Sequence, residues 1–144
     1  MPVTSTSGDT GNGATLTFAT TAFAVGLQNI QGWTEEVERL EVSTLATTSF
    51  KRYIASDLKE TPEITVNFYW DTSLARPAIG GTPETMTITF PIRTNGGEAT
   101  AANYAGTGFI RSITWPTLEN GSVQMGSMVL SFDGTTGPTW TKSA

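Results

Sequence analysis

The sequence predicts a mainly β protein, an antiparallel sandwich or barrel with at most one short helix and long loops. Threonine occupies 27 of the 144 positions, and β-branched residues favour strands. The segments EITVNFYW (63–70) and ETMTITFPI (84–92) alternate apolar and polar residues, as half-buried strands do. Glycine and proline punctuate the runs between them, which is typical of a sandwich or barrel.

The length predicts one domain, because 144 residues is the usual size of a single core. With 38% hydrophobic and 15% charged residues the chain is expected to fold. Residues 1–13, MPVTSTSGDTGNG, are rich in Ser, Thr and Gly and predict a flexible N-terminal arm. The single β domain is therefore expected at residues 14–144.

The sequence of the first half of the domain predicts three strands before the strand at 63–70. Two strands are expected between Ala14 and Trp33, where Gly26 and Gly32 indicate bends or bulges. A third is expected within 35–44, where the apolar residues fit neither period cleanly and suggest a bulge. The segment Ser49–Leu58 places its apolar residues at helical spacing and predicts a short helix or an ordered loop.

The second half predicts a loop and then a C-terminal hairpin. Proline and glycine within 72–83 predict mostly loop. Runs at 106–115 and 122–132 flank Asn120-Gly121, the dipeptide that favours a type I′ turn. A last short strand is expected at 139–141.

The composition argues against catalysis. The chain has no His and no Cys, which removes the side chain best suited to proton transfer near neutral pH, the commonest metal ligand, and thiolate nucleophiles. The acidic cluster Glu35, Glu36, Glu38 and Glu41 could act as the carboxylate pair of a hydrolase, but a solvated strand is the favoured interpretation. We expect no enzyme and no cofactor.

Charge and hydropathy restrict the partners. A net charge of −5 argues against tight binding to a nucleic-acid backbone, which requires Lys and Arg. No apolar run is long enough to span a bilayer, and no signal peptide is recognised at the N-terminus. The four Trp residues leave open an immunoglobulin-like or carbohydrate-binding adhesion module of a virion or cell surface.

The segment Glu41–Asp71 carries Val-Ser-Thr at 42–44, FKRYI at 50–54, Leu-Lys at 58–59 and then the alternating strand. In this order these residues resemble the corresponding segment of the major tail tube proteins of long-tailed, siphovirus-type phages. The runs ITFPI, GTGFIRSI and GSMVLSFDGTTGPTWT are similar to the last strands of that family, so the resemblance covers about residues 35–141. Many relatives carry a helix where this chain has its Pro and Gly-rich segment between Asp71 and Thr85.

The resemblance implies a β-sandwich protomer of the tail tube type. Copies would close into hexameric rings that stack into a hollow tube conducting double-stranded DNA into the host, with DNA passing in transit and without specific binding. Further implied partners are the tape measure, tail terminator and baseplate proteins. The implied location is the virion tail, after synthesis in the host bacterial cytoplasm, with no membrane contact.

The resemblance also implies site residues. Ser43–Glu60 would be a long loop that reaches an adjacent subunit or ring, and its expected inter-subunit contacts are Phe50, Lys51, Arg52, Tyr53, Ile54 and Leu58. The strand 63–70 would lie near the bore, so Glu63, Thr65 and Asn67 are expected to face the lumen. Glu36 and Glu38 are added because a two-residue spacing puts both on one side of a strand. An acidic, polar wall would keep DNA from adhering.

Overall fold

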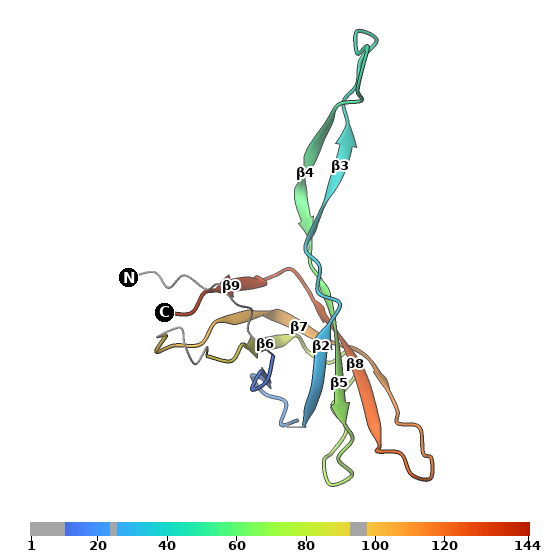
Figure 1. The fold of residues 1–144 in the computed structure, drawn as a ribbon, viewed down its shortest axis with the longest axis vertical. Coiled ribbons are helices and arrows are strands. Elements are labelled where there is room, and N and C mark those ends of the chain that lie inside the picture. The colour runs from blue at the N-terminus through green and yellow to red at the C-terminus, as the bar shows by residue number, and fades with distance from the viewer. Residues whose placement is uncertain (1–10, 24–25, 93–97) are drawn as a thin grey trace.

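The fold is all β in a computed structural model that describes residues 11–23, 26–92 and 98–144. Every regular element in these ranges is a strand, and every pairing is antiparallel, which confirms the predicted fold class (Figure 1). The strands are β1 (Thr15–Phe18), β2 (Leu27–Gln31), β3 (Glu36–Glu41), β4 (Tyr53–Glu60), β5 (Glu63–Tyr69), β6 (Glu84–Thr89), β7 (Asn103–Thr114), β8 (Met125–Phe132) and β9 (Thr139–Thr141).

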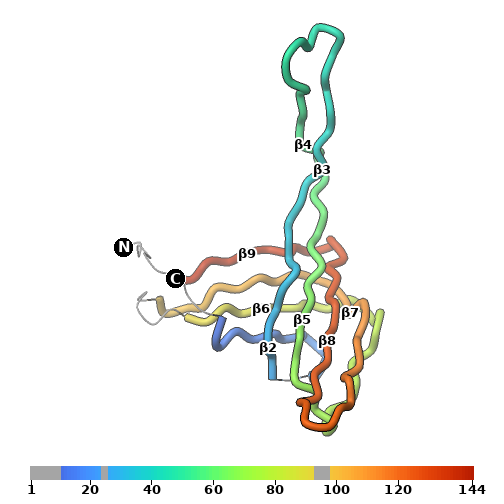
Figure 2. Tube along the Cα trace, turned by 45° about the vertical axis from the view of Figure 1, so that its right-hand side comes forward, coloured from blue at the N-terminus to red at the C-terminus, as the bar shows by residue number. Residues whose placement is uncertain are grey.

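Seven strands form one sheet that folds over on itself. Its order is β1-β6-β7-β8-β5-β2, with β9 paired to β7, while β3 and β4 form a separate pair. In Figure 2, β6, β9 and the first part of β7 run crosswise to β2, β5 and β8. The sheet is therefore two layers whose strands cross, joined at a corner, as in an orthogonal packing.

The long strand β7 makes the corner. Its residues 103–108 pair with β6 and its residues 108–114 pair with β8, so it belongs to both layers. Gly106 and Gly108 are buried on its inner face at the crossing point. A Cβ at Gly108 would lie 2.6 Å from Met86 Cε and would clash with the Ser131 carbonyl oxygen. Only glycine lets the layers approach this closely.

The core lies between the two layers and is built by alternation. Ile64, Val66 and Phe68 of β5 are fully buried, as their alternating pattern predicts, while Glu63 and Tyr69 are exposed. The other buried members of the core cluster are Met86, Ile88, Tyr104, Ile110, Met128, Leu130 and Phe132. A close-packed interior of this kind fixes how the outer faces and loops are presented.

The expectation of a helix or ordered loop at Ser49–Leu58 is wrong for most of that segment. Residues up to 52 form a loop, and β4 begins at Tyr53 and pairs with β3. The β3–β4 register runs from Val37 opposite Lys59 directly to Arg39 opposite Ala55, so β4 bulges at residues 56–58. This bulge breaks the two-residue alternation and leaves a spacing that imitates a helix.

The hairpin between β7 and β8 is present, but its expected tight turn is not. Residues 115–124 connect the strands. Gly121 has φ +83°, whereas no described non-glycine residue has positive φ, so Asn120 cannot occupy a type I′ position. The ten-residue connection is instead a loop that carries exposed apolar side chains.

The remaining element predictions are confirmed within the described residues. Two strands lie between residues 14 and 33, one lies at 36–41, residues 72–83 hold no helix or strand, and β9 occupies 139–141. The bulge expected within 35–44 lies instead in the partner strand β4. Most of the predicted N-terminal arm, residues 1–10, lies outside the described ranges.

Substituting Gly108 with Ala tests the corner of the sheet. The new methyl group would contact the Ser131 carbonyl and Met86, so G108A should lose about 1–3 kcal/mol of unfolding free energy. Chemical denaturation measures the loss. Gly11 has open space where a Cβ would lie, and G11A is therefore the control expected to leave stability unchanged. Equal stability of the two variants would contradict the close approach at the corner.

Candidate assembly interface

A two-stranded hairpin projects from the body of the protein (Figures 1 and 2). We call residues 36–60 the arm, since they comprise β3, β4 and the loop at the tip. The arm prolongs the β2–β5 pair of the main sheet, because β2 leads into β3 and β4 leads into β5. Gly32, with φ +85°, and the buried Pro62 lie where the ladder is interrupted between the two pairs.

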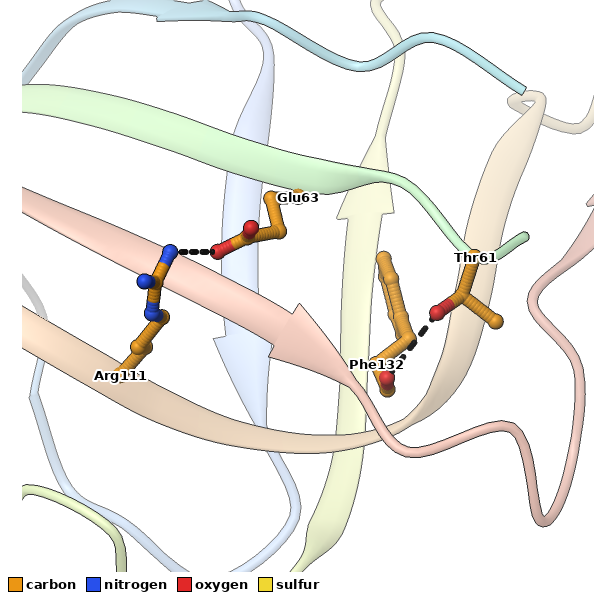
Figure 3. A network of polar contacts seen from close by, with 4 residues as sticks. All are labelled: Thr61, Glu63, Arg111 and Phe132. Carbon is orange, nitrogen blue, oxygen red and sulfur yellow. Dashed lines mark hydrogen bonds and ion pairs between the residues drawn. The ribbon is translucent and has the colours of Figure 1, made fainter. Parts of the chain in front are cut away.

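The base of the arm is fixed to the core by aromatic packing. Trp33 stacks on Phe90 with ring centroids 5.4 Å apart and meets Tyr104 edge-on at 5.5 Å. The Tyr104 hydroxyl donates a hydrogen bond of 2.8 Å to Glu35 Oε1. On the other strand, Thr61 Oγ1 donates to the Phe132 carbonyl oxygen at 3.1 Å (Figure 3). These contacts set the direction in which the arm leaves the body.

The environment of Tyr104 favours its protonated form. Burial raises the pKa of the Tyr104 hydroxyl well above its usual range, and the hydrogen bond to Glu35 and that carboxylate's charge raise the pKa further. The phenol therefore stays neutral and keeps donating to Glu35 through the ordinary pH range.

Both faces of the arm carry large side chains. Leu40 lies opposite Ile54, and Val42 follows Leu40 by two residues on the same face. The N–H of Val42 donates to the Arg52 carbonyl oxygen. On the other face the Arg39 guanidinium lies 3.8 Å from the centre of the Tyr53 ring, a cation–π contact.

The arm carries many exposed apolar side chains. Of the large hydrophobic side chains that are exposed in the described structure, eight of fifteen lie on it. They are Val37, Leu40, Val42, Leu45, Phe50, Tyr53, Ile54 and Leu58. A two-stranded hairpin is only marginally stable alone, and an exposed apolar patch marks an interaction site. The arm is therefore the strongest candidate for a protein interface.

The structure places the six predicted contact residues in the tip loop and on β4, and none of them on β3. Phe50 is 85% exposed in the tip loop, beside exposed Lys51 and Arg52. Leu58 is 80% exposed and belongs to the bulge of β4. Tyr53 and Ile54 point to opposite faces because they are consecutive in a strand. Any partner that contacts all six must wrap around the arm.

The predicted lumen residues fall into two separate groups. Glu63, Thr65 and Asn67 point away from the core on the outer face of β5. Glu36 and Glu38 lie on the projecting arm. Glu38 has no directly opposite residue in β4, because the β3–β4 register shifts between Val37 and Arg39. The structure therefore does not bring the two groups onto one surface of the main sheet.

The outer face of the β2-β5-β8-β7 layer is mostly polar and close to neutral, although Val129 of β8 and Phe109 of β7 also lie on it. The Arg111 guanidinium binds Glu63 across β8 at 2.6 Å (Figure 3), and Asn67 Nδ2 donates to Asn29 Oδ1 at 2.6 Å. Strand register places further hydroxyl and amide side chains there, namely Gln31, Ser112, Thr114, Ser127 and Ser131. The expectation of an acidic wall is not met on this face, because the carboxylate of Glu63 is paired. The sequence offered no local pattern that could reveal Arg111 as its partner.

This layer also has two open edges. Strand β2 pairs only with β5 in the described structure, and residues 111–114 of β7 pair only with β8. Neither stretch contains proline or lysine, residues that commonly protect edges from pairing with another chain.

The end of the body opposite the arm carries an aromatic pocket. Its volume is about 260 Å³, and its lining includes Phe68, Trp70, Trp115, Asp71 and Arg76. Trp70 and Trp115 have ring centroids 4.9 Å apart, and the Arg76 guanidinium lies 5.9 Å from the Trp115 ring centre.

This geometry gives little support to the two alternatives left open by the sequence, a hydrolase that uses the acidic cluster and a carbohydrate-binding module that uses the Trp residues. Glu35 is bound to Tyr104, and Glu36, Glu38 and Glu41 are exposed along one strand. Among the described residues, no cluster of three or more potential ligands can hold a metal ion. Trp33 and Trp140 both pack on Phe90, whereas Trp70 and Trp115 lie together elsewhere, so the four rings do not form one sugar-binding face.

Comparison with known proteins does not assign the chain to a family. No protein-family model matches the sequence, and no curated protein matches it. A search of the described residues also finds no helix suited to crossing a membrane.

The Tyr104–Glu35 bond predicts a measurable titration. Since the folded pKa of Tyr104 is raised, its contribution to stability is complete below the ordinary tyrosine pKa of about 10 and declines as the pH rises toward the folded value. The absorbance of tyrosinate should show a late-titrating group in the wild type that Y104F removes.

Two variants separate the causes of that titration. E35Q should lower the Tyr104 pKa only in part, because burial is the larger cause. Y104F should cost about 0.5–1.5 kcal/mol through loss of the hydrogen bond. If the wild type shows no tyrosine that titrates later than those of Y104F, the burial of Tyr104 and its hydrogen bond to Glu35 are contradicted.

Proposed function

We propose that this protein is a structural protein of a phage tail, whose copies assemble into rings that stack into a hollow tube for double-stranded DNA. The observation that carries this proposal is the four-stranded layer with a polar outer face and two open edges. The arm supplies a second contact, directed out of the plane of such a ring.

The strand directions of the layer suit ring closure. Its order is β2-β5-β8-β7 with every neighbour antiparallel, so the edge strands β2 and β7 run in opposite directions. Copies in the same orientation can therefore join β2 to β7 and continue an antiparallel sheet. Such a head-to-tail contact generates a closed ring when the rotation between copies closes. Closure also removes the exposed edges.

The outer face then becomes the wall of the bore. The second layer and the core lie on the opposite side of the sheet, so the polar side chains of β2, β5, β7 and β8 would face the lumen. Because Glu63 is paired with Arg111, this wall offers DNA hydrogen-bonding groups and little excess charge. Few unpaired cations means little phosphate binding, which suits DNA in transit.

The arm connects rings in this proposal. It continues the line of β2 and β5 beyond the sheet, so it leaves the ring along the direction of the tube. The apolar side chains of the arm would be buried against another copy. Tape measure, terminator and baseplate proteins would meet the same surfaces at the ends of the tube.

Electron microscopy of the purified protein over a range of concentrations, with mass from light scattering, tests the proposal. Rings or hollow tubes are expected. A monomer at every concentration would overturn it and would favour the adhesion module, which needs no self-association.

Substituting Phe50 with Asp tests the role of the arm. Phe50 is almost fully exposed, so F50D should change stability by less than about 0.5 kcal/mol. Burying the new carboxylate in an interface is costly, so tube formation should fall at least tenfold in yield by sedimentation. T48D places the same charge two residues away on the tip, at an exposed polar position, and should assemble. Normal tubes from F50D would contradict a role for the tip.

A further inference from the structure

Exposed apolar side chains gather at two opposite ends of the molecule. One group is the arm. The other is the loop end, defined here as residues 69–79 and 115–123, where β5 and β7 end (Figure 1). Its exposed members include Tyr69, Trp115, Leu118 and Val123, with Leu118 76% exposed. Two different patches at opposite ends suit a head-to-tail contact, which propagates, rather than a self-complementary one.

The loop end contains a pocket that fits an aromatic side chain. Its volume of about 260 Å³ is bounded by Phe23, Phe68, Trp70 and Trp115. A cavity of about 150 Å³ is sufficient to bind benzene. The exposed ring of Phe50 therefore has room to enter, and aromatic rings pack favourably edge-to-face or offset against such walls.

The charges of the two patches are complementary. The tip loop, residues 42–52, contains Lys51 and Arg52 and no acidic residue. The loop end contains Asp71 and Glu119 against Arg76. Asp71 accepts hydrogen bonds from the Ser73 hydroxyl at 2.6 Å and backbone N–H at 2.9 Å, which hold its pKa below the usual range. The carboxylate is ionised at neutral pH at the rim of the pocket.

We propose that the loop end of one copy is the acceptor for the arm tip of a second copy, with Phe50 seated in the aromatic pocket against the adjoining rings of Trp70 and Trp115. The proposal rests on the proposed function, which it deepens by naming the surface that the arm contacts. Lys51 and Arg52 would lie toward Asp71 and Glu119. Each copy then offers one arm and one acceptor, so the contact extends without limit along one direction.

Mixing two blocked variants tests the pairing of these surfaces. F50D blocks the arm and leaves the acceptor intact, whereas W115D blocks the acceptor and leaves the arm intact. Each alone should remain at one mass by light scattering. An equimolar mixture should form complexes of about twice that mass and stop there, because only one productive contact remains. No increase on mixing, with wild-type tubes forming normally, would overturn the acceptor site while leaving the proposed function standing.

A second acceptor variant guards against misfolding. Trp115 contacts Trp70, so W115D is checked by circular dichroism, and L118D serves as the alternative because Leu118 projects into solvent. W115D and L118D should each form complexes of about twice the single mass when mixed with F50D. Cross-linking from benzoylphenylalanine at position 50 in wild-type assemblies should label residues 69–79 or 115–123 of another copy. Labelling of another copy's arm instead would overturn the proposal, and failure of the wild type to assemble at all would overturn the proposed function as well.

Discussion

The passage of β7 from one layer to the other is the constraint on which the rest of the structure depends. Gly108 is paired with Glu84 of β6 on one side and with Phe132 of β8 on the other, so one residue lies in both layers. The absence of a side chain there lets Met86 and the β8 backbone close over it. Because the layers meet at this point, the buried residues of β5, β6 and β8 share one core. The outer faces of both layers are consequently left to solvent or to partners.

The surfaces of the molecule differ in polarity. The β2-β5-β8-β7 layer has an outer face on which amide and hydroxyl groups and one paired carboxylate predominate, with Val129 and Phe109 among them. The arm and the loop end hold most of the exposed large apolar side chains of the described structure. In the proposed assembly, the open strand edges would make the lateral contacts and the apolar ends would make the axial contacts.

The anchoring of the arm links the core to the candidate interface. Trp33 and Tyr104 pack together, and Glu35 and Thr61 bind to core strands on both sides of the arm's base. These contacts fix the base, whereas in the described residues the strand pair beyond them packs on itself, through the β3–β4 ladder and the Arg39–Tyr53 contact. In the proposed assembly, the fixed base would direct the arm before contact, and the marginally stable free end would gain stability on contact.

The sequence by itself determined the strand content, the buried side of β5 and the loop at 72–83, because alternation and glycine or proline punctuation act locally. The role of the arm segment as a contact region is implied by the family resemblance and stays a prediction. The strand at Tyr53–Glu60, the Glu63–Arg111 pair and the pocket at the loop end were decided by tertiary structure. The bulge in β4 hides its alternation, and Glu63 and Arg111 are 48 residues apart. Pairing across a sheet depends on register between distant segments, and no local pattern of residues encodes that register.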